Sequence, residues 1–278
     1  MRNVAVIGIV GNSVFLPVEN FHVGGETVEA QSVHFELGGK GFNQAVAAAR
    51  YGANVSFLAA VGADSYDSVK AFLEKENIHA TLAKKQENTA FAAIITDKKG
   101  SNRVTVYQGA QLSENDVELF ENAIKNADIL LLNNEVTEEV NVKAIEIAKR
   151  YGVKVVLNPA PARKTCAYVL ENVYLFTPNE HETLGLDDKQ NVVITLGGEG
   201  CLIKSTNTKI PPIQVNAVDT TGAGDTFNGV LATCLSENAD IEQAVRTATI
   251  GSGISVTRKY AVSSIPTKQE IDAYTKKA

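Results

Sequence analysis

The sequence predicts an α/β protein in which helices cover both faces of a mostly parallel central sheet. Short β-rich apolar runs alternate with amphipathic helical segments along most of the chain, which is the pattern of consecutive βα units. Two separated regions show strand-like alternation without helices between them, so they predict a second, smaller sheet.

The alternating segments give the expected elements of the core. The expected strands are residues 4–9, 55–60, 129–133, 153–157 and 192–196, and the expected helices are residues 41–51, 65–76, 140–151, 225–235 and 241–256, with a short helix after Pro266. Because parallel strands direct their carboxyl ends to one edge of a sheet, we expect the active site at that edge.

The second sheet is expected to come from residues 13–37 and 89–108, the latter with a turn signal at Asp97-Lys98-Lys99-Gly100. A small sheet that projects from an α/β core can form a lid over the site, and its exposed face can form a homodimer contact. The alternative is that both regions are edge hairpins.

The composition is that of one ordered protein with a small-molecule ligand. A chain of 278 residues with 44% hydrophobic residues fits a single domain over residues 1–278, although composition alone does not separate one domain from two. A net charge of −6 without a run of Lys or Arg argues against nucleic acid as a partner.

No apolar run approaches the roughly 20 residues that span a bilayer, so we expect no membrane partner and a cytoplasmic location. Cys166, Cys201 and Cys234 lie far apart in apolar runs, which favours buried thiols over disulfides or a zinc site.

The glycine-rich stretch 218–227 suits phosphoryl transfer to an alcohol. Glycines allow a tight turn, so the backbone amides of Gly222, Ala223 and Gly224 can converge on one anion where a helix begins. Asp225 would then stand beside that anion, where a carboxylate can accept the proton of an attacking hydroxyl. The alternative is structural, because strand-to-helix turns favour small residues and an acid.

A second glycine-rich stretch, 37–45, is a candidate polyol site. Lys40 and Asn43 offer hydrogen-bonding groups to hydroxyls, while Gly38 and Gly39 let a sugar approach the backbone. The stretch lacks the spacing G-x-x-x-x-G-K-[ST], so the P-loop mechanism is disfavoured. It can also be no more than a strand-to-helix turn.

Together the two motifs resemble the signatures of the ribokinase-like (PfkB) carbohydrate kinases. The matching residues are Gly38-Gly39-Lys40-Gly41-x-Asn43-Gln44-Ala45 and Asp219-Thr220-x-Gly222-Ala223-Gly224-Asp225-Thr226-Phe227. Between them, the stretches 158–163, 177–180 and 195–200 resemble the ribokinase branch of the family. The resemblance spans nearly the whole chain and implies a three-layer α/β/α sandwich with a small β-sheet lid that often dimerises.

The resemblance also implies roles for individual residues. Asp225 would be the general base, and the amides of Gly222, Ala223 and Gly224 would form the anion hole. The implied contacts of the acceptor are Gly39, Lys40, Asn43, Glu135 and Asp225. The implied contacts of the nucleotide are Asn179, Thr195, Gly197, Gly200, Gly224 and Thr249, and Asn179 and Glu182 would order Mg²⁺ through water.

The resemblance further implies a site for K⁺. The loop that binds K⁺ in ribokinases, mostly through backbone carbonyls, aligns with Asp219, Thr221, Ser255, Arg258, Tyr260 and Ser264. The implied cofactors are therefore ATP and Mg²⁺, with K⁺ as a further one.

The chain departs from the family pattern at three places. Gly11 and Ser13 stand where the family has a sugar-binding asparagine and aspartate, and a register slip that brings Asn12 to the first of these places would not restore the acid. Free ribose as the acceptor is therefore in question, because a lost buried pairing weakens discrimination. Tyr260 replaces a glycine usual in ribokinases. Only residues 183–190 separate the Asn179 motif from the next strand, so one peripheral helix is expected to be trimmed.

The leading interpretation is an ATP-dependent, Mg²⁺-requiring kinase that phosphorylates a primary hydroxyl of a sugar or sugar-like compound. The alternatives are a nucleoside or pseudouridine kinase of the same fold, and a sugar-responsive binding or regulatory protein that has lost catalysis. The intact base, anion hole, Asn179 and Glu182 favour the enzyme, since a binding protein does not need all four.

Overall fold

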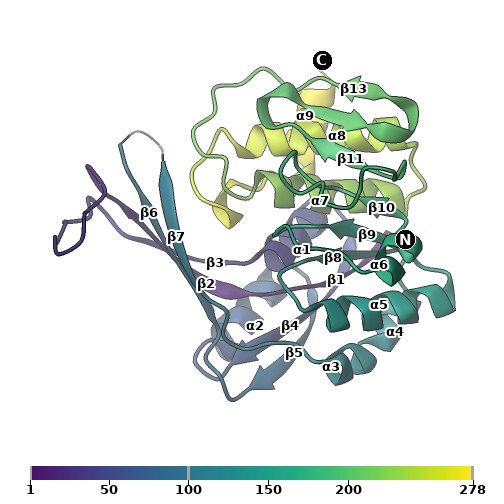
Figure 1. Ribbon diagram of the computed structural model, residues 1–278, viewed down its shortest axis with the longest axis horizontal. Helices are drawn as coiled ribbons and strands as arrows, with labels where there is room; N and C mark the ends of the chain where they lie inside the picture. The colour runs from purple at the N-terminus through teal and green to yellow at the C-terminus, as the bar shows by residue number, and fades with distance from the viewer. Residues whose placement is uncertain (1, 99–100, 277–278) are drawn as a thin grey trace.

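Six parallel strands form the central sheet (Figure 1). The computed structural model describes residues 2–98 and 101–276. The strand order is β10-β9-β8-β1-β4-β5, and every neighbouring pair is parallel. The strands are β1 (Asn3–Ile7), β4 (Asn54–Gly62), β5 (His79–Lys85), β8 (Ile129–Asn133), β9 (Lys154–Asn158) and β10 (Leu175–Phe176). The predicted α/β class is confirmed, although β5 and β10 were not among the expected strands.

Helices cover both faces of this sheet. One face packs against α1 (Lys40–Arg50), α2 (Tyr66–Lys75) and α7 (Ala223–Ser236). On the same side of the molecule, α8 (Ile241–Ser255) packs on α7, and α9 (Lys268–Thr275) packs on α8. The other face packs against α3 (Glu114–Leu119), α4 (Glu121–Lys125), α5 (Glu138–Tyr151) and α6 (Ala167–Asn172). None of these helices, within the described part of the chain, is long and apolar enough to cross a membrane.

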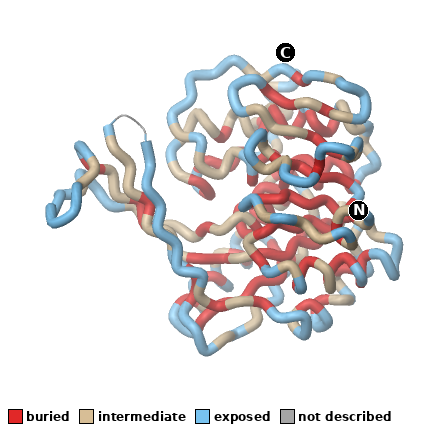
Figure 2. The backbone as a smooth tube through the Cα atoms, in the orientation of Figure 1, coloured by how far each residue is buried: buried red, intermediate tan, exposed pale blue. Residues whose placement is uncertain are grey.

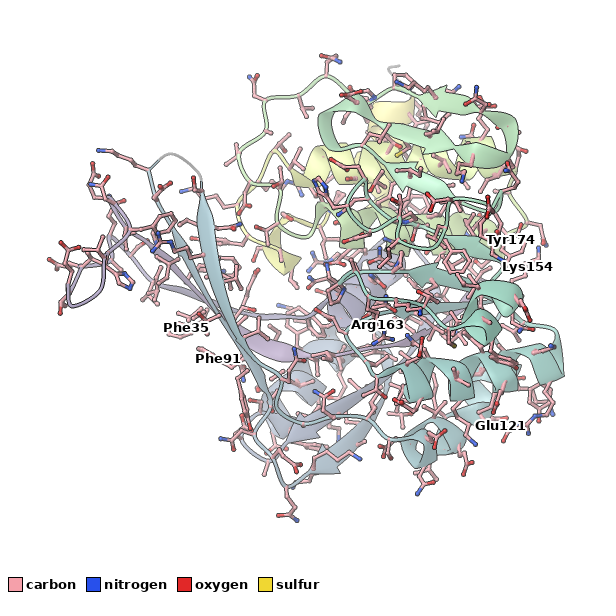
Figure 3. All side chains as sticks on the ribbon, in the orientation of Figure 1. Phe35, Phe91, Glu121, Lys154, Arg163 and Tyr174 are labelled. Carbon is pink, nitrogen blue, oxygen red and sulfur yellow. The ribbon has the colours of Figure 1, made fainter. Side chains whose placement is uncertain are left out.

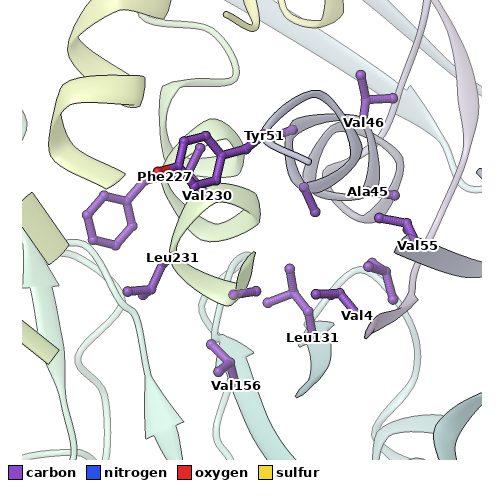
Figure 4. Close-up of a cluster of buried hydrophobic side chains, with 14 of the residues drawn as sticks. Val4, Ala45, Val46, Tyr51, Val55, Leu131, Val156, Phe227, Val230 and Leu231 are labelled. Carbon is purple, nitrogen blue, oxygen red and sulfur yellow. The ribbon is translucent and has the colours of Figure 1, made fainter. Parts of the chain in front are cut away.

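The two faces explain the apolar runs of the sequence. Val4 and Val6 of β1 point into the core beneath α1 and α7, whereas Ala5 and Ile7 point into the core beneath α5. Side chains alternate along a strand, so a strand buried on both faces must be apolar throughout. Figure 4 shows Val4 among the side chains of the first core, and Figure 2 shows the buried strands at the centre of the molecule. Cys201 and Cys234 are buried free thiols as expected, and Cys166 is a half-buried one.

A four-stranded sheet projects from the core and comes from two distant pieces of chain (Figure 1). Its order is β3-β2-β6-β7, made of β2 (Gly11–Pro17), β3 (His34–Gly38), β6 (Ala90–Thr96) and β7 (Asn102–Tyr107). β2 and β6 pair in parallel, so the two pieces form one sheet and not separate edge hairpins. Between β2 and β3 the chain is irregular except for a bridge of Val18 with Ala30. In the predicted turn, Asp97 N donates to Ser101 O, while Lys99 and Gly100 lie outside the described residues.

The strand expected at residues 192–196 lies in a third sheet. β11 (Val193–Thr195) pairs antiparallel with β12 (Cys201–Ile203), which pairs with β13 (Thr208–Ile210). Two isolated parallel bridges, Phe176 with Val192 and Asn179 with Thr195, connect this segment to the end of the central sheet and to the loop after it. A tight turn at Gly197–Glu199 joins β11 to β12, and so short a connection permits only antiparallel pairing. No helix occupies described residues 183–190, which confirms the trimmed connection.

The start of α1 packs on the end of β1 through two glycines. A Cβ on Gly41 would lie 2.5 Å from the Cα of Gly8, and a Cβ on Gly8 would lie 2.6 Å from the Cα of Gly41. Part of the 37–45 glycine motif therefore serves close backbone packing, and this packing fixes the helix that carries Lys40 and Asn43.

We expect Gly41→Ala to lower the free energy of unfolding by about 2 kcal/mol, because the new methyl group overlaps backbone that has to shift. Urea denaturation measures the loss. Gly24→Ala is the matched control, since a Cβ on Gly24 meets no atom within 4 Å. We expect that control to change stability by less than about 0.5 kcal/mol. Equal stabilities of the two variants would contradict the close-packing role of Gly41.

Candidate functional site

The predicted base is buried where α1 and α7 pack together. Asp225 lies in the first turn of α7 and is only 6% exposed. The two helices approach closely at Gly229, because a Cβ there would collide with the carbonyl oxygen of Gln44. The glycine one turn beyond the base therefore lets α1 bring its amide side chains to Asp225.

Both carboxylate oxygens of Asp225 accept hydrogen bonds from α1. Asn43 Nδ2 donates to Oδ2 at 2.9 Å, and Gln44 Nε2 donates to Oδ1 at 3.2 Å. The same Gln44 nitrogen lies 3.3 Å from Oδ1 of Asn158, at the end of β9. A carboxylate held in this way keeps its orientation before an acceptor arrives, so little reorganisation is needed during reaction.

A cation and a second carboxylate lie beside Asp225. Glu135 follows the end of β8, and its Oε2 accepts the backbone N–H of Lys40 at 2.7 Å. The negative charge of Asp225 raises the pKa of Lys40, against the opposing effect of burial. Burial raises the pKa of Glu135 to about 7, although the charge of Lys40 opposes this rise. At neutral pH the site therefore holds a charged lysine and a glutamate that is close to its titration midpoint.

We expect kcat/KM for the acceptor to rise with pH through an apparent pKa of about 7. Above that pKa Glu135 is ionised and both of its oxygens can accept hydrogen bonds from hydroxyls, whereas the protonated form has to donate one. Initial rates at acceptor concentrations well below KM measure the profile. Glu135→Gln cannot titrate, so its profile should lack this limb. Persistence of the limb in that variant would assign the titration to another group.

The turn before α7 leaves an open helix end beside Asp225. Gly222 is the N-cap residue in the left-handed conformation, with φ 75°, and no side chain caps the helix. The first N–H groups of a helix have no intrahelical partner, and a Cβ on Gly224 would meet no atom within 4 Å. The amide of Ala223 differs, because it donates to Thr220 O at 3.2 Å. The free amides and the helix dipole favour an anion at this point.

The implied nucleotide residues lie around the turn between β11 and β12. Asn179 and Thr195 form a parallel bridge, which places the two loops side by side. Gly200 has no room for a side chain, because a Cβ would collide with Ile210 O. The Thr249 hydroxyl, on α8, donates to Val245 O at 2.8 Å and lies 3.4 Å from Cys201 Sγ. The hydroxyl of Thr249 thus faces the core next to β12.

Asn179 and Glu182 form a local turn. Asn179 N donates to Glu182 Oε2 at 3.0 Å, and Asn179 Oδ1 accepts the N–H of His181 at 2.8 Å. The charge of Glu182 contributes to the raised pKa of Lys40, so this carboxylate lies on the side of the molecule that holds Asp225.

The implied cation loop is joined by the carboxylate of Asp219. Its Oδ1 accepts the N–H and the hydroxyl of Thr221 at 2.9 and 2.7 Å, and its Oδ2 accepts the N–H of Tyr260 at 2.8 Å. Tyr260 has φ 72°, a conformation that favours glycine. The other implied side chains bond elsewhere: Ser255 to Ser252 O, Ser264 to Ala261 O, and Arg258 to Glu270. Backbone carbonyls would therefore have to hold a cation here.

A cavity of about 310 Å³ lies between the projecting sheet and the residues around Asp225. It is lined by Lys40, Glu135 and the Gly38-Gly39 backbone, and on the side of the projecting sheet by Gly11, Ser13, Ala90, Ala92 and Val106. A Cβ on Gly11 would lie 2.8 Å from Ala90 O, so this backbone has no room for an asparagine there. Asn12 does not take its place, because its amide donates to Ser65 Oγ at 2.7 Å. The sheet side of the cavity therefore consists mostly of small and apolar residues, with Asn12, Ser13 and Gln108 as its polar members.

Two residues that the structure brings to this region were not singled out from the sequence. Gln44 stands inside the glycine motif, directly after Asn43, and its position there was the available signal. Glu36 of β3 accepts hydrogen bonds from the backbone of residues 261–263. No local pattern marks Glu36, because most of its hydrogen-bond partners are backbone amides and all of them lie 225 positions or more along the chain.

Comparisons with known proteins agree with this architecture. The model of the pfkB family of carbohydrate kinases matches residues 1–268. Ribokinase of Haemophilus influenzae is 38% identical over 97% of both chains, and deoxyribokinase of Salmonella typhi is 34% identical over 90% of this chain and 91% of its own. The crystal structure of ribokinase from Thermotoga maritima has a TM-score of 0.90 at 33% identity and covers 99% of this chain and 100% of its own. The chain therefore belongs to the pfkB family of carbohydrate kinases, phosphotransferases whose acceptor is an alcohol group.

Proposed function

We propose that the protein transfers the γ-phosphoryl group of ATP to a primary hydroxyl of a sugar or sugar-like compound, with Mg²⁺ as cofactor and Asp225 as general base. The observation that carries this proposal is the position of Asp225. Its carboxylate is buried, held by Asn43 and Gln44, and adjacent to the uncapped start of α7. A base beside an anion site is the arrangement that phosphoryl transfer to an alcohol requires.

In the proposed reaction the acceptor oxygen attacks the γ-phosphorus while its proton passes to Asp225. The bond from the γ-phosphorus to the bridging oxygen breaks, and ADP leaves. The amides at the start of α7 stabilise the negative charge of the transferring group, and Lys40 adds a positive charge near Asp225. Asn43 and Gln44 hold the carboxylate in position throughout.

The residues proposed for Mg²⁺ fit its chemistry. Asn179 and Glu182 supply amide and carboxylate oxygens, and Mg²⁺ is commonly held by one or two such groups together with water and substrate phosphates. Once bound, the ion would neutralise phosphate charge. Thr195, Gly197 and Gly200 are proposed as neighbours of the nucleotide, and Thr249 as part of the helix next to it.

The acceptor is proposed to be a compound that needs few hydrogen bonds from the sheet side of the cavity. No carboxylate lines the sheet side of the cavity, and Gly11, Ala90 and Ala92 offer no hydrogen-bonding side chain, so D-ribose should have little advantage over a sugar with fewer ring hydroxyls. A nucleoside or pseudouridine is the second candidate, because small side chains leave room for a larger acceptor. An inactive binding protein is a weaker third candidate, since a binding role gives no reason to hold Asp225 beside an open helix end.

The direct test is ADP release from Mg²⁺-ATP with pentoses, hexoses, their phosphates and nucleosides as acceptors. An acceptor that is phosphorylated by the wild type and not by Asp225→Asn supports the kinase and identifies its substrate. Silence across the set, with ligand binding retained in calorimetry, would favour the binding protein.

A monovalent cation is proposed to support activity through the loop of Asp219, Thr221, Ser255, Arg258, Tyr260 and Ser264. The tie between Asp219 and Tyr260 keeps the two halves of this loop together. We expect turnover to be several-fold higher in K⁺ than in Na⁺ at equal ionic strength, because a bound cation would fix the turn before α7. Steady-state rates in the two salts measure this, and equal rates would count against the cation site.

The chain is further proposed to be one kinase domain over residues 1–278, with a discontinuous lid at about 13–37 and 89–108 that also forms a homodimer contact. Phe35, Phe91 and Tyr107 are exposed apolar side chains on the lid strands, and Figure 3 labels the first two. They share one face, since Phe91 pairs with Tyr107 and Phe35 lies two positions away in register. Sedimentation velocity measures the oligomeric state.

A further inference from the structure

One carboxylate ties the lid to the loop that follows α8. Glu36 of β3 accepts the N–H groups of Ala261, Val262 and Ser263 at 2.7, 3.3 and 3.2 Å, together with the Ser263 hydroxyl at 2.8 Å. The Glu36 side chain is 8% exposed. Hydrogen bonds to an ionised acceptor are stronger than neutral ones, so this is a specific attachment of lid to body.

An aromatic contact lies beside this carboxylate. The ring of His34 stacks on the ring of Tyr260 with centroids 3.7 Å apart and an interplanar angle of 10°. Phe15 of β2 meets the same tyrosine edge-on at 5.1 Å. Tyr260 holds a left-handed backbone conformation that is unfavourable for a residue with a side chain. The contacts of Tyr260 with the lid therefore offset a local strain in the body.

The loop that the lid grips also borders the turn before α7. Tyr260 N donates to Asp219, and the same carboxylate binds the N–H and hydroxyl of Thr221. Ala261 packs against Gly222, since a Cβ on Gly222 would lie 3.2 Å from both the Cα and the Cβ of Ala261. Ala261 thus contacts the lid through its amide and the proposed anion hole through its side chain.

We propose that Glu36, His34 and Tyr260 form a latch through which lid closure positions the anion-hole turn. The inference rests on the proposed function, because the turn matters only if it binds the transferring phosphate. With the latch made, the wall of the acceptor cavity and the phosphate site are held in one arrangement. Coupling of this kind is reciprocal, so nucleotide at the turn also favours the closed lid. The short helical turn Val262–Ser264 that follows α8 contacts β3, on the side of the body that faces the projecting sheet in Figure 1.

The kinetic test uses Glu36→Gln, which keeps the shape of the side chain but turns an NH₂ group towards amide donors. We expect KM for the acceptor to rise and kcat to fall, each by about tenfold, because both sites lose their common support. A rise of KM with unchanged kcat would overturn the coupling and leave Glu36 a local lid residue. Glu19→Gln is the matched control, since Glu19 is an exposed lid carboxylate paired with Lys98, away from the body. We expect wild-type constants for it.

A second measurement does not depend on turnover. Hydrogen exchange of Glu36→Gln should rise in residues 34–38, in residues 258–264 and also in residues 219–222. A rise confined to β3 would overturn the latch, as would no change at all. If no acceptor is phosphorylated by the wild type, the proposed function fails, yet this experiment still reports whether lid and turn are linked. Thermal unfolding of both variants checks that the fold is retained.

Discussion

Asp225→Asn should lower kcat by about 10²- to 10⁴-fold, the range that a general base typically contributes. The asparagine has nearly the same size, but its amide cannot take the acceptor proton. Acceptor binding should change little, because Lys40 and Glu135 remain in place. ADP release at saturating Mg²⁺-ATP and acceptor measures kcat, and calorimetry with the acceptor alone measures binding.

The substitution also meets the donors around the carboxylate, which makes a stability control necessary. Asn43 and Gln44 both point amide nitrogens at residue 225, so an asparagine NH₂ group faces at least one of them. Asp116→Asn is the control, because it also removes the charge of a partly buried carboxylate. Asp116 pairs with Lys85 and forms part of the capping box of α3, away from the candidate site. Asp116→Asn should keep its kcat. A loss of turnover that tracks the loss of stability in both variants would refute the assignment of Asp225 as base.

The central fold could be predicted because its signals are local. A strand buried on both faces has to be apolar throughout, as in residues 4–7 of β1, and the helices between strands carry a clear apolar stripe. β10 escaped prediction because it has only two residues. The pattern of alternating segments assigns the strand at 192–196 to the central sheet, because an apolar run does not reveal its partner. That partner, β12, follows a tight turn only a few residues later.

The grouping of the candidate site residues could be predicted where they belong to the same glycine-rich motif. Asp225 and the turn of Gly222 are adjacent in the chain, and Asn43 belongs to the same short motif as Lys40. The contacts of Glu36 could not be predicted, because most of its donors are backbone N–H groups, and every residue except proline carries such a group whatever its side chain. The strained backbone conformation of Tyr260 could not be predicted either, although the sequence shows a tyrosine where ribokinases usually have glycine.

Ser13 is the residue at which a single change should alter the choice of acceptor. It lines the cavity from β2, and the sequence resemblance implies that it stands in the place of a sugar-binding aspartate. In the proposed reaction the 5-hydroxyl of a pentose lies at Asp225, so its hydroxyls at the other end would reach the part of the cavity that β2 and β6 line. We expect the wild type to use D-ribose and 2-deoxy-D-ribose with kcat/KM values within about threefold of each other, because no side-chain carboxylate on β2 pairs with the 2-hydroxyl.

Ser13→Asp should raise the ratio of kcat/KM for ribose over deoxyribose to between about tenfold and a hundredfold, the value of a hydrogen bond to a charged group. The ratio is the informative quantity, because Ser13 lies directly opposite Glu36 in the register of β2 and β3. Two carboxylates placed there repel one another and weaken the lid for both sugars alike, so this penalty cancels. Ser13→Asn is the control, since it fills the same space without a charge and should move the ratio much less. An unchanged ratio in Ser13→Asp would show that the ring hydroxyls do not reach β2, and the acceptor would then have to bind in another orientation.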